Sequence, residues 1–478
     1  MKYNNTKRIY LAGSIILLVT LLFFEKPCIA QQTTDAGINY IHYRPAGTKA
    51  GDVIPFYHDG SYHIFYLRDN DWAHMVSKDL IRWNELPNAL AKSKDPLAPD
   101  GEACWTGSIV EHNKLFYLFY TGKNMQDPLG DQKVMMATSK DLITWTKQDH
   151  TFYADGKIYW NKPINGAIDD KQIYHHQAFR DPEVFRNNAT NEWWMMLHAM
   201  LADGSSPAMG RYISTDLVHW TPAAPLVVYP RSVSGDCPGF FSSNNKSFIY
   251  CADYHYMQSD SIGGPYNPQV KAYDCGDLRV PKLMWDGTRY ILVGWICDYE
   301  GYTDAGATAW GGTLSMPREV YTDSAGNLYQ RPPKEIIQTF KTIASGKTAV
   351  KNALLLKAPA DLMFHTKLKA SDAASEVQIN FRQGKDTAHM GYHLRINFAT
   401  KEIETGSAFK TYKRICDFDI AKPVDIRIFA LGNVIECFVN DAYCFTMHGY
   451  DSSGNGLSVK ALAGNITIQN YEVGVLRK

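Results

Sequence analysis

Four acidic residues precede strand-like segments at similar distances along the chain. Asp52, Asp181, Asp236 and Asp277 each lie 10 to 13 residues before a segment rich in aromatic and β-branched residues. If these carboxyls converge, they repel one another, and at least one should have a raised pKa. A proton donor beside an ionised carboxylate is what glycosidic bond cleavage requires. Calcium binding is the second use of clustered acids, but no D-x-D-x-D-G loop is present, so we predict neither a metal nor a cofactor.

Asp181 lies in the run Phe179-Arg180-Asp181-Pro182. Pro182 excludes a helix interior and removes a ladder donor, so Asp181 is predicted where a loop enters a strand. Arg180 has the geometry for a two-pronged hydrogen bond to a carboxylate or a hydroxylated ligand. The simpler interpretation is a surface Arg–Asp pair at the start of a strand. The remainder of the chain favours the functional interpretation.

A sequence repeat indicates which elements carry these acids. The pattern S-x-D-L-(I/V)-x-W begins at Ser77, Ser139 and Ser214, each time after strand-rich segments. Its Ser and Asp are suited to capping a tight turn, so the motif is predicted to be structural. A recurring unit of four strands is typical of a β-propeller blade. Two less regular units follow, around residues 247–250 and 289–295, which gives five predicted blades.

In a propeller the first strand of each blade lines the central channel. Four of the five units place an acid near the start of that strand, and the second unit has Trp105-Thr106-Gly107-Ser108 there instead. The acids are therefore expected at one end of the channel. Beyond about residue 340, period-two runs such as 377–381 and 425–429 predict an all-β sandwich. The predicted domains are a propeller over 31–340 and a sandwich over 341–478.

Length and charge narrow the possible functions. The chain has 478 residues, which favours two domains, and Lys+Arg and Asp+Glu both total 49, which argues against nucleic-acid binding. Residues 1–30 combine a basic start, an apolar stretch over 9–24 and the small-residue site Cys28-Ile29-Ala30. This predicts a signal peptide and a periplasmic or secreted protein. No later stretch has membrane-spanning length, and the oligomeric state stays open.

Eight cysteines remain after the predicted cleavage, without C-x-x-C spacing, so a zinc site is not expected. Cys437 and Cys444 lie opposite each other if Asn440-Asp441 forms a two-residue hairpin turn. That pair would fall in the hydrogen-bonded register, where side chains are farther apart, which disfavours a disulfide.

Several segments together resemble glycoside hydrolase family 32, the β-fructofuranosidases (invertase, inulinase, levanase). They are residues 51–66, Trp72-Ala73-His74-Met75-Val76-Ser77, Trp105-Thr106-Gly107-Ser108, Phe179-Arg180-Asp181-Pro182, the closing segment 310–319 and sandwich residues 427–441. The Arg-Asp-Pro run and the closing segment are fairly specific in combination.

The resemblance implies Asp52 as nucleophile, Asp181 as transition-state stabiliser and Asp236 as acid/base. It also implies a fructosyl-binding role for Arg180 together with Asp181. Trp72 and Trp105 would line the sugar pocket, and core packing is the alternative for each. The full set of predicted substrate-binding residues is Arg180, Trp72, Trp105, Ser108 and Asp277.

Two departures from the family pattern bear on mechanism. The W-M-N-D-P-N-G motif is absent around Asp52, and the usual Glu-Cys-Pro is here Asp236-Cys237-Pro238. Asp is one methylene shorter than Glu, so we hypothesise a wider carboxyl gap than the family norm. Retaining enzymes hold the two carboxyls about 5–5.5 Å apart and inverting ones roughly 6.5–9.5 Å. A wider gap implies altered stereochemistry, an altered acceptor or weak activity.

The leading interpretation is a glycosidase that cleaves fructosyl linkages in fructans or sucrose-type sugars, with an oligo- or polysaccharide substrate. A related five-blade furanosidase of the arabinose type, with inverting chemistry, is one alternative. A carbohydrate-binding propeller that has lost catalysis through the changes at Asp52 and Asp236 is another.

Overall fold

A computed structural model describes residues 41–161, 178–231, 233, 235–252, 255–266, 271–347, 349–384, 391–417 and 419–477. The predicted signal peptide lies outside these residues. No helix among the described residues is long and apolar enough to span a membrane.

The first part of the chain forms five antiparallel sheets, and in the first four of them each strand pairs with the next in sequence. The first sheet holds β1 (Val53–His58), β2 (Ser61–Arg68), β3 (Asp71–Ser77) and β4 (Asn84–Leu90). The second holds β5 (Ala103–His112), β6 (Leu115–Lys123), β7 (Gln132–Ser139) and β8 (Thr146–Lys147). The third holds β9 (Phe179–Asn187), β10 (Glu192–Met200), β11 (Pro207–Ser214) and β12 (Thr221–Val228).

Two further sheets complete this part. The fourth holds β13 (Gly239–Ser243), β14 (Lys246–Tyr250), β15 (His255–Ser259) and β16 (Lys271–Ala272). The fifth holds β18 (Leu278–Trp285), β19 (Tyr290–Tyr299), β21 (Arg318–Thr322) and β22 (Leu328–Arg331), with β20 (Thr308–Leu314) paired to β19.

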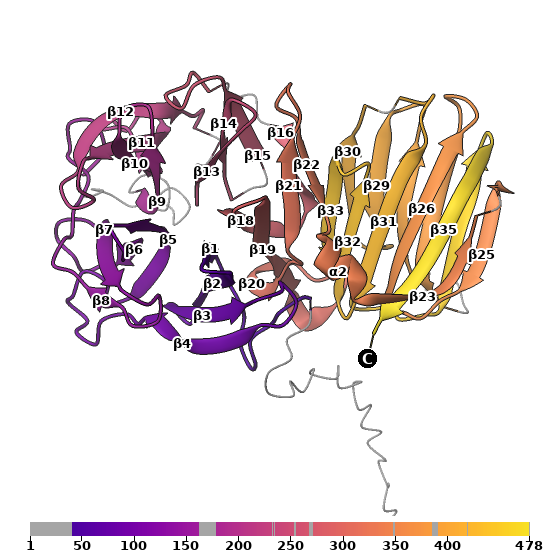
Figure 1. The fold of residues 1–478 in the computed structure, drawn as a ribbon, viewed down its shortest axis with the longest axis horizontal. Helices are drawn as coiled ribbons and strands as arrows, with labels where there is room; N and C mark the ends of the chain where they lie inside the picture. The colour runs from indigo at the N-terminus through magenta and orange to yellow at the C-terminus, as the bar shows by residue number, and fades with distance from the viewer. Residues whose placement is uncertain are drawn as a thin grey trace, which may run out of the picture. The chain divides into compact units, whose positions relative to one another are not determined.

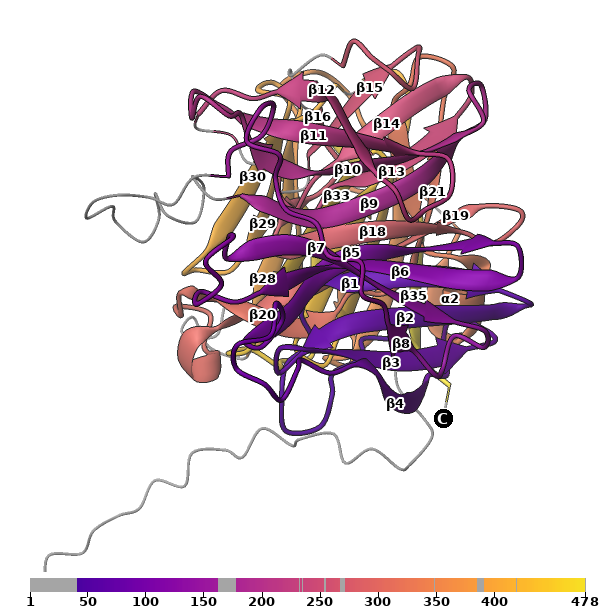
Figure 2. The same ribbon diagram turned by 90° about the vertical axis from the view of Figure 1, so that its left-hand side faces the viewer.

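The sheets stand around a common centre, with their first strands innermost (Figure 1), and Figure 2 shows the same sheets from the side. The innermost strands touch one another around the ring: β1 contacts β5 and β18, β9 contacts β5 and β13, and β13 contacts β18. This arrangement is a β-propeller, as predicted.

The repeated motif forms the turn that follows the third strand of each of the first three sheets. In the first copy, the Asp79 carboxylate accepts hydrogen bonds from the backbone N–H groups of Ile81 (3.0 Å) and Arg82 (2.8 Å). Leu80 has φ of 64° and is fully buried, and Trp83 is buried behind it. The structural interpretation of the motif is therefore confirmed.

The second part of the chain is a β-sandwich, also as predicted. One sheet has the order β17-β33-β32-β31-β26-β35-β23, with β24 paired to β35, and the other has the order β25-β34-β27-β28-β29-β30. The strands of the first sheet are β17 (Cys275–Gly276), β23 (Phe340–Gly346), β24 (Val350–Lys351), β26 (Leu362–Ala370), β31 (Val424–Leu431), β32 (Val434–Val439), β33 (Tyr443–His448) and β35 (Ile466–Leu476). Those of the second are β25 (Ala353–Lys357), β27 (Glu376–Gln383), β28 (Tyr392–Asn397), β29 (Glu402–Gly406), β30 (Thr411–Ile415) and β34 (Gly456–Ala463). Alternate residues of β26, β27, β28 and β31 point into the core between the sheets.

A short helix, α2 (Lys334–Gln338), precedes β23, and a 3₁₀ turn, η1 (Glu300–Tyr302), follows β19. The division near residue 340 stays a prediction, because Gly37–Lys478 behave as one unit in their internal contacts.

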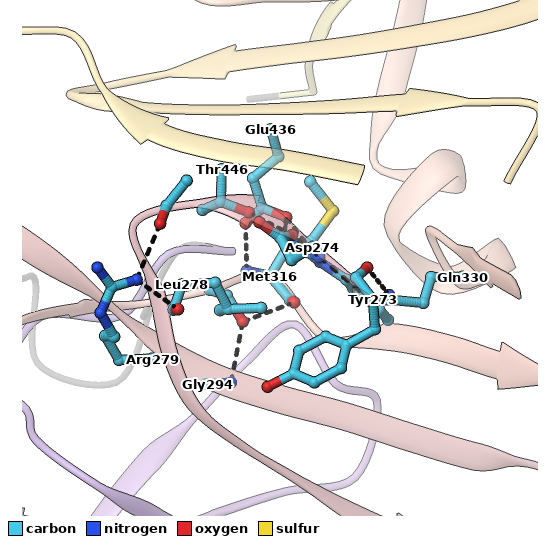
Figure 3. Close-up of polar contacts among 12 residues, drawn as sticks. Tyr273, Asp274, Leu278, Arg279, Gly294, Met316, Gln330, Glu436 and Thr446 are labelled. Atoms are coloured by element: carbon cyan, nitrogen blue, oxygen red, sulfur yellow. Dashed lines mark hydrogen bonds and ion pairs between the residues drawn. The ribbon is translucent and has the colours of Figure 1, made fainter. Parts of the chain in front are cut away.

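A buried ionic cluster joins the two parts (Figure 3). The Arg318 guanidinium of β21 donates to Asp274 (2.6 Å), to Glu436 of β32 (2.8 Å) and to Thr446 of β33 (2.6 Å). All four side chains are buried. Beside the cluster, β17 adds to the sandwich by pairing in parallel with β33. The chain leading into the fifth sheet is therefore anchored to the sandwich.

The predicted two-residue turn between β32 and β33 is wrong by one residue. Phe438 pairs with Cys444 and Val439 with Tyr443, so the turn has three residues. Cys437 therefore points into the sandwich core, whereas Cys444 packs on the opposite face of the sheet. All eight cysteines among the described residues are free.

Candidate active site

Three of the four predicted acids come together at the centre of the propeller. Asp52 immediately precedes β1, Asp181 lies in β9, and Asp236 precedes β13. Cys237 connects them: its backbone N–H donates to Asp181 (3.0 Å), and its sulfur lies 3.5 Å from Asp52 Oδ2 and 3.4 Å from Asp181 Oδ2. Arg180 pairs with Asp236 through Nη2, and its Nε lies 3.6 Å from Asp181. The three carboxyls thus share one small polar centre.

Asp52 is buried and receives several hydrogen bonds. The Trp295 indole N–H donates to Oδ1 (2.9 Å), and the Thr106 hydroxyl donates to Oδ2. Burial raises the pKa of Asp52 above its ordinary value, and the bonds from Thr106, Trp295 and Cys237 and the charge of Lys282 offset only part of this rise. These donors fix the orientation of the carboxylate and favour its ionised form, the form in which a carboxylate can act as a nucleophile.

Asp181 occupies a strained position in an edge strand. Its φ is 62°, in the left-handed region that non-glycine residues rarely adopt. Its N–H donates to the Thr121 hydroxyl (2.7 Å). β9 begins at Phe179, so Asp181 lies inside the strand and not at its entry. Pro182 is tolerated because β9 pairs only with β10 and leaves its channel side free of ladder bonds.

Asp181 holds its proton unusually well for a carboxyl group. Burial raises the pKa of Asp181 to about 7; the charge of Arg180 opposes this, and the negative charges of Asp236 and Asp52 reinforce it. A carboxyl that is partly protonated near neutral pH lies beside two other acids, which is the electrostatic pattern expected from their convergence.

Arg180 is almost fully buried, at 1% exposure, which excludes the interpretation as a surface pair. Gln132 accepts hydrogen bonds from Arg180 Nη1 (3.1 Å) and from the Phe179 N–H (3.1 Å). The guanidinium is therefore held rigidly between Gln132 on one side and Asp236 and Asp181 on the other.

The Asp236 side chain is 17% exposed, against 4% for the side chain of Asp181, and Asp52 is 8% exposed as a residue. Oδ1 of Asp236 contacts Arg180 Nη2 and lies 3.5 Å from Nε2 of the buried His198. His198 stands directly opposite Arg180 across the β9–β10 ladder. Asp236 is thus held between two nitrogen-bearing side chains and faces the open side of the site.

The two tryptophans predicted to line the sugar pocket differ in burial. Trp72 is fully buried in the core between the first two sheets, and its indole donates to the Trp105 carbonyl (3.0 Å). Its predicted place in the sugar pocket is therefore wrong, because a side chain without exposed surface cannot meet a ligand; it supports the strand that carries Trp105. Trp105 itself is half-buried, and Lys123 Nζ lies 5.7 Å from its ring centroid.

Ser108 and Asp277 are also occupied by structural contacts. The Ser108 hydroxyl is buried and accepts the Val184 N–H (2.9 Å), which joins β5 to β9. Asp277 accepts hydrogen bonds from Tyr299 and from Tyr412 of the sandwich (2.6 Å for Tyr412). Its predicted place with the other acids is wrong: the parallel β17–β33 pairing draws this segment toward the sandwich.

Four residues at or beside the site escaped the sequence reasoning. Thr106 lies inside a quoted motif, but nothing in the motif identifies the hydroxyl as a partner of Asp52. Trp295 and His198 lie in the central strands β19 and β10, where apolar surroundings predict only packing. Trp310 packs its ring 5.7 Å from that of Trp295 and is 56% exposed, so it offers an aromatic face near Asp52.

Among the residues that the structure describes, no group of three or more His, Cys, Asp and Glu side chains is arranged to hold a metal ion. The donors and acids at the centre suit binding of a polyhydroxylated ligand and proton transfer to it.

Comparison with known proteins identifies a family. The model of the glycosyl hydrolases family 32 N-terminal domain matches residues 53–332. Sucrose-6-phosphate hydrolase of Escherichia coli is 28% identical over 377 residues, covering 70% of this chain and 74% of that protein. Levanase of Bacillus sp. (strain L7) is 26% identical over 498 residues, covering 91% and 52%. An insoluble β-fructofuranosidase isoenzyme of Arabidopsis thaliana is 25% identical over 356 residues, covering 65% and 62%. The chain thus spans less than two thirds of the last two proteins.

Solved structures agree in fold. The crystal structure of fructan 1-exohydrolase IIa from Cichorium intybus superposes with a TM-score of 0.72 at 19% identity, covering 91% of this chain and 97% of that one. Since the family model spans more than half of the sequence and the propeller and sandwich match, this chain belongs to glycosyl hydrolase family 32.

Proposed function

We propose that the protein is a glycosidase that cleaves fructosyl linkages in fructans or in sucrose-type sugars. The observation that carries the proposal is the convergence of Asp52, Asp181 and Asp236 around Cys237 and Arg180. The names of its relatives point to the same substrates: levanase, sucrose-6-phosphate hydrolase and β-fructofuranosidase.

Each residue has a proposed role. Asp52, held by Trp295 and Thr106, attacks the anomeric carbon of the fructosyl unit and forms a covalent intermediate. Asp236 donates a proton to the departing oxygen and then takes one from the incoming water. Asp181 and Arg180 bind fructosyl hydroxyls as charge develops on the ring.

The ion pair between Arg180 and Asp236 bears on the second role. A charge-assisted bond to a guanidinium favours the ionised carboxylate, whereas a general acid must start protonated. In the proposed cycle, the oxygen of a bound fructosyl hydroxyl accepts a hydrogen bond from the guanidinium in place of Asp236. Asp236 is then free to accept a proton. The same pair is the one observation that favours the alternative, a carbohydrate-binding propeller without turnover.

A substrate panel tests these proposals. Purified protein is incubated with sucrose, 1-kestose, inulin and levan, and with an arabinofuranoside for contrast, and free sugar is quantified. Fructose release by the wild type that falls at least 100-fold in Asp52→Asn and Asp236→Asn supports the proposal. Asp417→Asn, whose side chain is 91% exposed, serves as the control and should behave like the wild type. Calorimetrically detected binding without release would instead establish the binding protein.

The shorter acid at 236 adds a prediction about stereochemistry. Retention with ordinary rates would mean that the carboxyl gap is normal despite the missing methylene, whereas inversion would mean that a water fits between the two acids. Proton NMR of the first anomer released from a fructoside distinguishes the two outcomes.

We also propose that the protein is exported, on the strength of the basic, apolar and small-residue segments within residues 1–30. N-terminal sequencing of protein recovered from the periplasm or medium should begin at Gln31. Recovery of full-length protein in the cytoplasm would contradict this.

A further inference from the structure

An ion pair between a buried lysine and a partly buried glutamate lies in the central channel of the propeller, next to the three carboxyls. Lys282 Nζ of β18 lies 2.8 Å from Glu183 Oε2 of β9, and it also donates to the Pro238 carbonyl. Lys282 is 3% exposed. Both charged residues line a cavity of about 230 Å³ whose other walls come from β1 and β5. Because these are innermost strands of four different blades, the cavity occupies the central channel.

The backbone is distorted to bring Lys282 into the channel. The register between β18 and β19 shifts between Arg279 and Lys282, and Val280 has φ of 43°. A β-branched residue in this region is a clear outlier, and such strain persists only where the surroundings impose it. Asp181 and Cys237, with φ of 62° and 47°, are strained in the same way. The distortion that positions Lys282 thus belongs with the distortions that shape the site.

Stability alone gives little reason for a charged pair here. A buried ion pair roughly breaks even with well-packed apolar residues of similar volume. What distinguishes this pair is its contact with Pro238, the third residue of the turn that carries Asp236 and Cys237. The charge of Lys282 also acts on the carboxyl centre, since it lowers the pKa of Asp52, which burial raises.

We propose that Lys282 and Glu183 form a positioning pair for the reaction. Lys282 holds the turn of Asp236 and Pro238 in place and keeps Asp52 ionised for attack, and Glu183 fixes Lys282 and limits the effect of its charge. This inference rests on the proposed glycosidase function, and neither residue needs to touch the substrate.

The groups that face Lys282 determine the expected sign. Glu183 faces it from β9, and Tyr250 of β14 accepts the adjacent Leu283 N–H (2.9 Å). The charge of Lys282 also acts on Asp52, which precedes β1, and on Cys237 in the turn before β13. Asp52 itself is close to Cys237 and interacts with Asp181 of β9, whose pKa the negative charge of Asp52 raises. Removing the positive charge of Lys282 is expected to raise the pKa of Asp52. Removing the negative charge of Glu183 leaves the positive charge less compensated and lowers the pKa of Asp52. The two substitutions therefore act in opposite directions, although they break the same ion pair.

The test compares pH profiles of kcat/KM for fructose release. In Lys282→Met we expect the acidic limb to move up by about one pH unit, and in Glu183→Gln to move down by about half as much. Lys282→Arg should return the limb toward that of the wild type. If the pair were purely structural, both variants would be less thermally stable, but the acidic limbs of their kcat/KM profiles would not shift in opposite directions. Shifts of the same sign, or none, would overturn the proposal.

A second readout does not depend on turnover. A diazoacetamide esterifies a protonated carboxyl, with transfer of the acid proton to the diazo carbon and loss of N₂, and mass spectrometry of the Asp52 peptide follows the extent at each pH. The esterification midpoint should move up in Lys282→Met and down in Glu183→Gln. If the wild type releases no fructose but the midpoints separate, the proposed function fails and the charge relationship stands. If fructose is released and the midpoints coincide, the positioning pair fails alone.

Discussion

Asp181 is predicted to destabilise the folded protein above neutral pH, and Asp181→Asn to relieve this. Burial raises the pKa of Asp181 from 3.8 to about 7, so the folded state binds a proton that the unfolded state releases over this pH range. Stability is therefore lost as pH rises from 3.8 through 7, and the loss is complete above pH 7. Asn is close in shape to the protonated carboxyl and keeps an oxygen for the Cys237 N–H.

The size of the effect follows from the two pKa values. A gap between 3.8 and about 7 corresponds to about 4 kcal/mol, because each pKa unit is worth 1.36 kcal/mol. With an unfolding entropy of about 2.1 cal/mol/K per residue, a chain of 478 residues changes its Tm by about 1 °C per kcal/mol. Asp181→Asn should therefore melt about 4 °C higher than the wild type at pH 8 and at a similar temperature at pH 4.

Differential scanning calorimetry of both proteins at several pH values between 4 and 8 measures this. Asp417→Asn, at an exposed position, is the matched control and should track the wild type throughout. A Tm difference between Asp181→Asn and the wild type that stays constant across the range would refute the reasoning, because it would mean that Asp181 titrates alike in the folded and unfolded states.

Three further predictions concern the surroundings of the site. Trp295→Phe removes the indole donor to Asp52. A hydrogen bond to a charged group contributes about 1.5–3 kcal/mol, so the acidic limb of kcat/KM, measured as a pH profile, should move to higher pH by about one to two units. Arg318→Met leaves the buried carboxylates of Asp274 and Glu436 without the Arg318 cation, so the free energy of unfolding should fall by about 3–5 kcal/mol, seen as a lower Tm. Arg331→Met, at a 47% exposed position, is the control and should cost less than about 1 kcal/mol. Because the eight described cysteines are free, a reducing agent should leave the Tm unchanged, and alkylation of the unfolded protein should label all eight without prior reduction.

Much of the fold was accessible from local patterns in the sequence. The Ser-x-Asp-Leu motif marks the end of three third strands, because its side chains cap a turn within a few residues of themselves. Period-two apolar runs identify sandwich strands, because alternate residues face one core. The hairpin between Cys437 and Cys444 shows the limit of such patterns, since a turn longer by one residue reverses which face each cysteine takes.

The sequence by itself determined that Asp52, Asp181 and Asp236 stand at equivalent places in the first, third and fourth blades, and blade geometry was enough to bring them together. Only the tertiary structure decided what each carboxyl meets there. Trp295 is 243 residues from Asp52, and Glu183 is 99 from Lys282, and no local pattern links either pair. The same holds for Asp277, whose spacing matches that of the other acids but whose segment is drawn to the sandwich. Spacing along the chain fixes the position of a residue within its own strand. Its protonation, burial and partners depend on which distant strands pack around it.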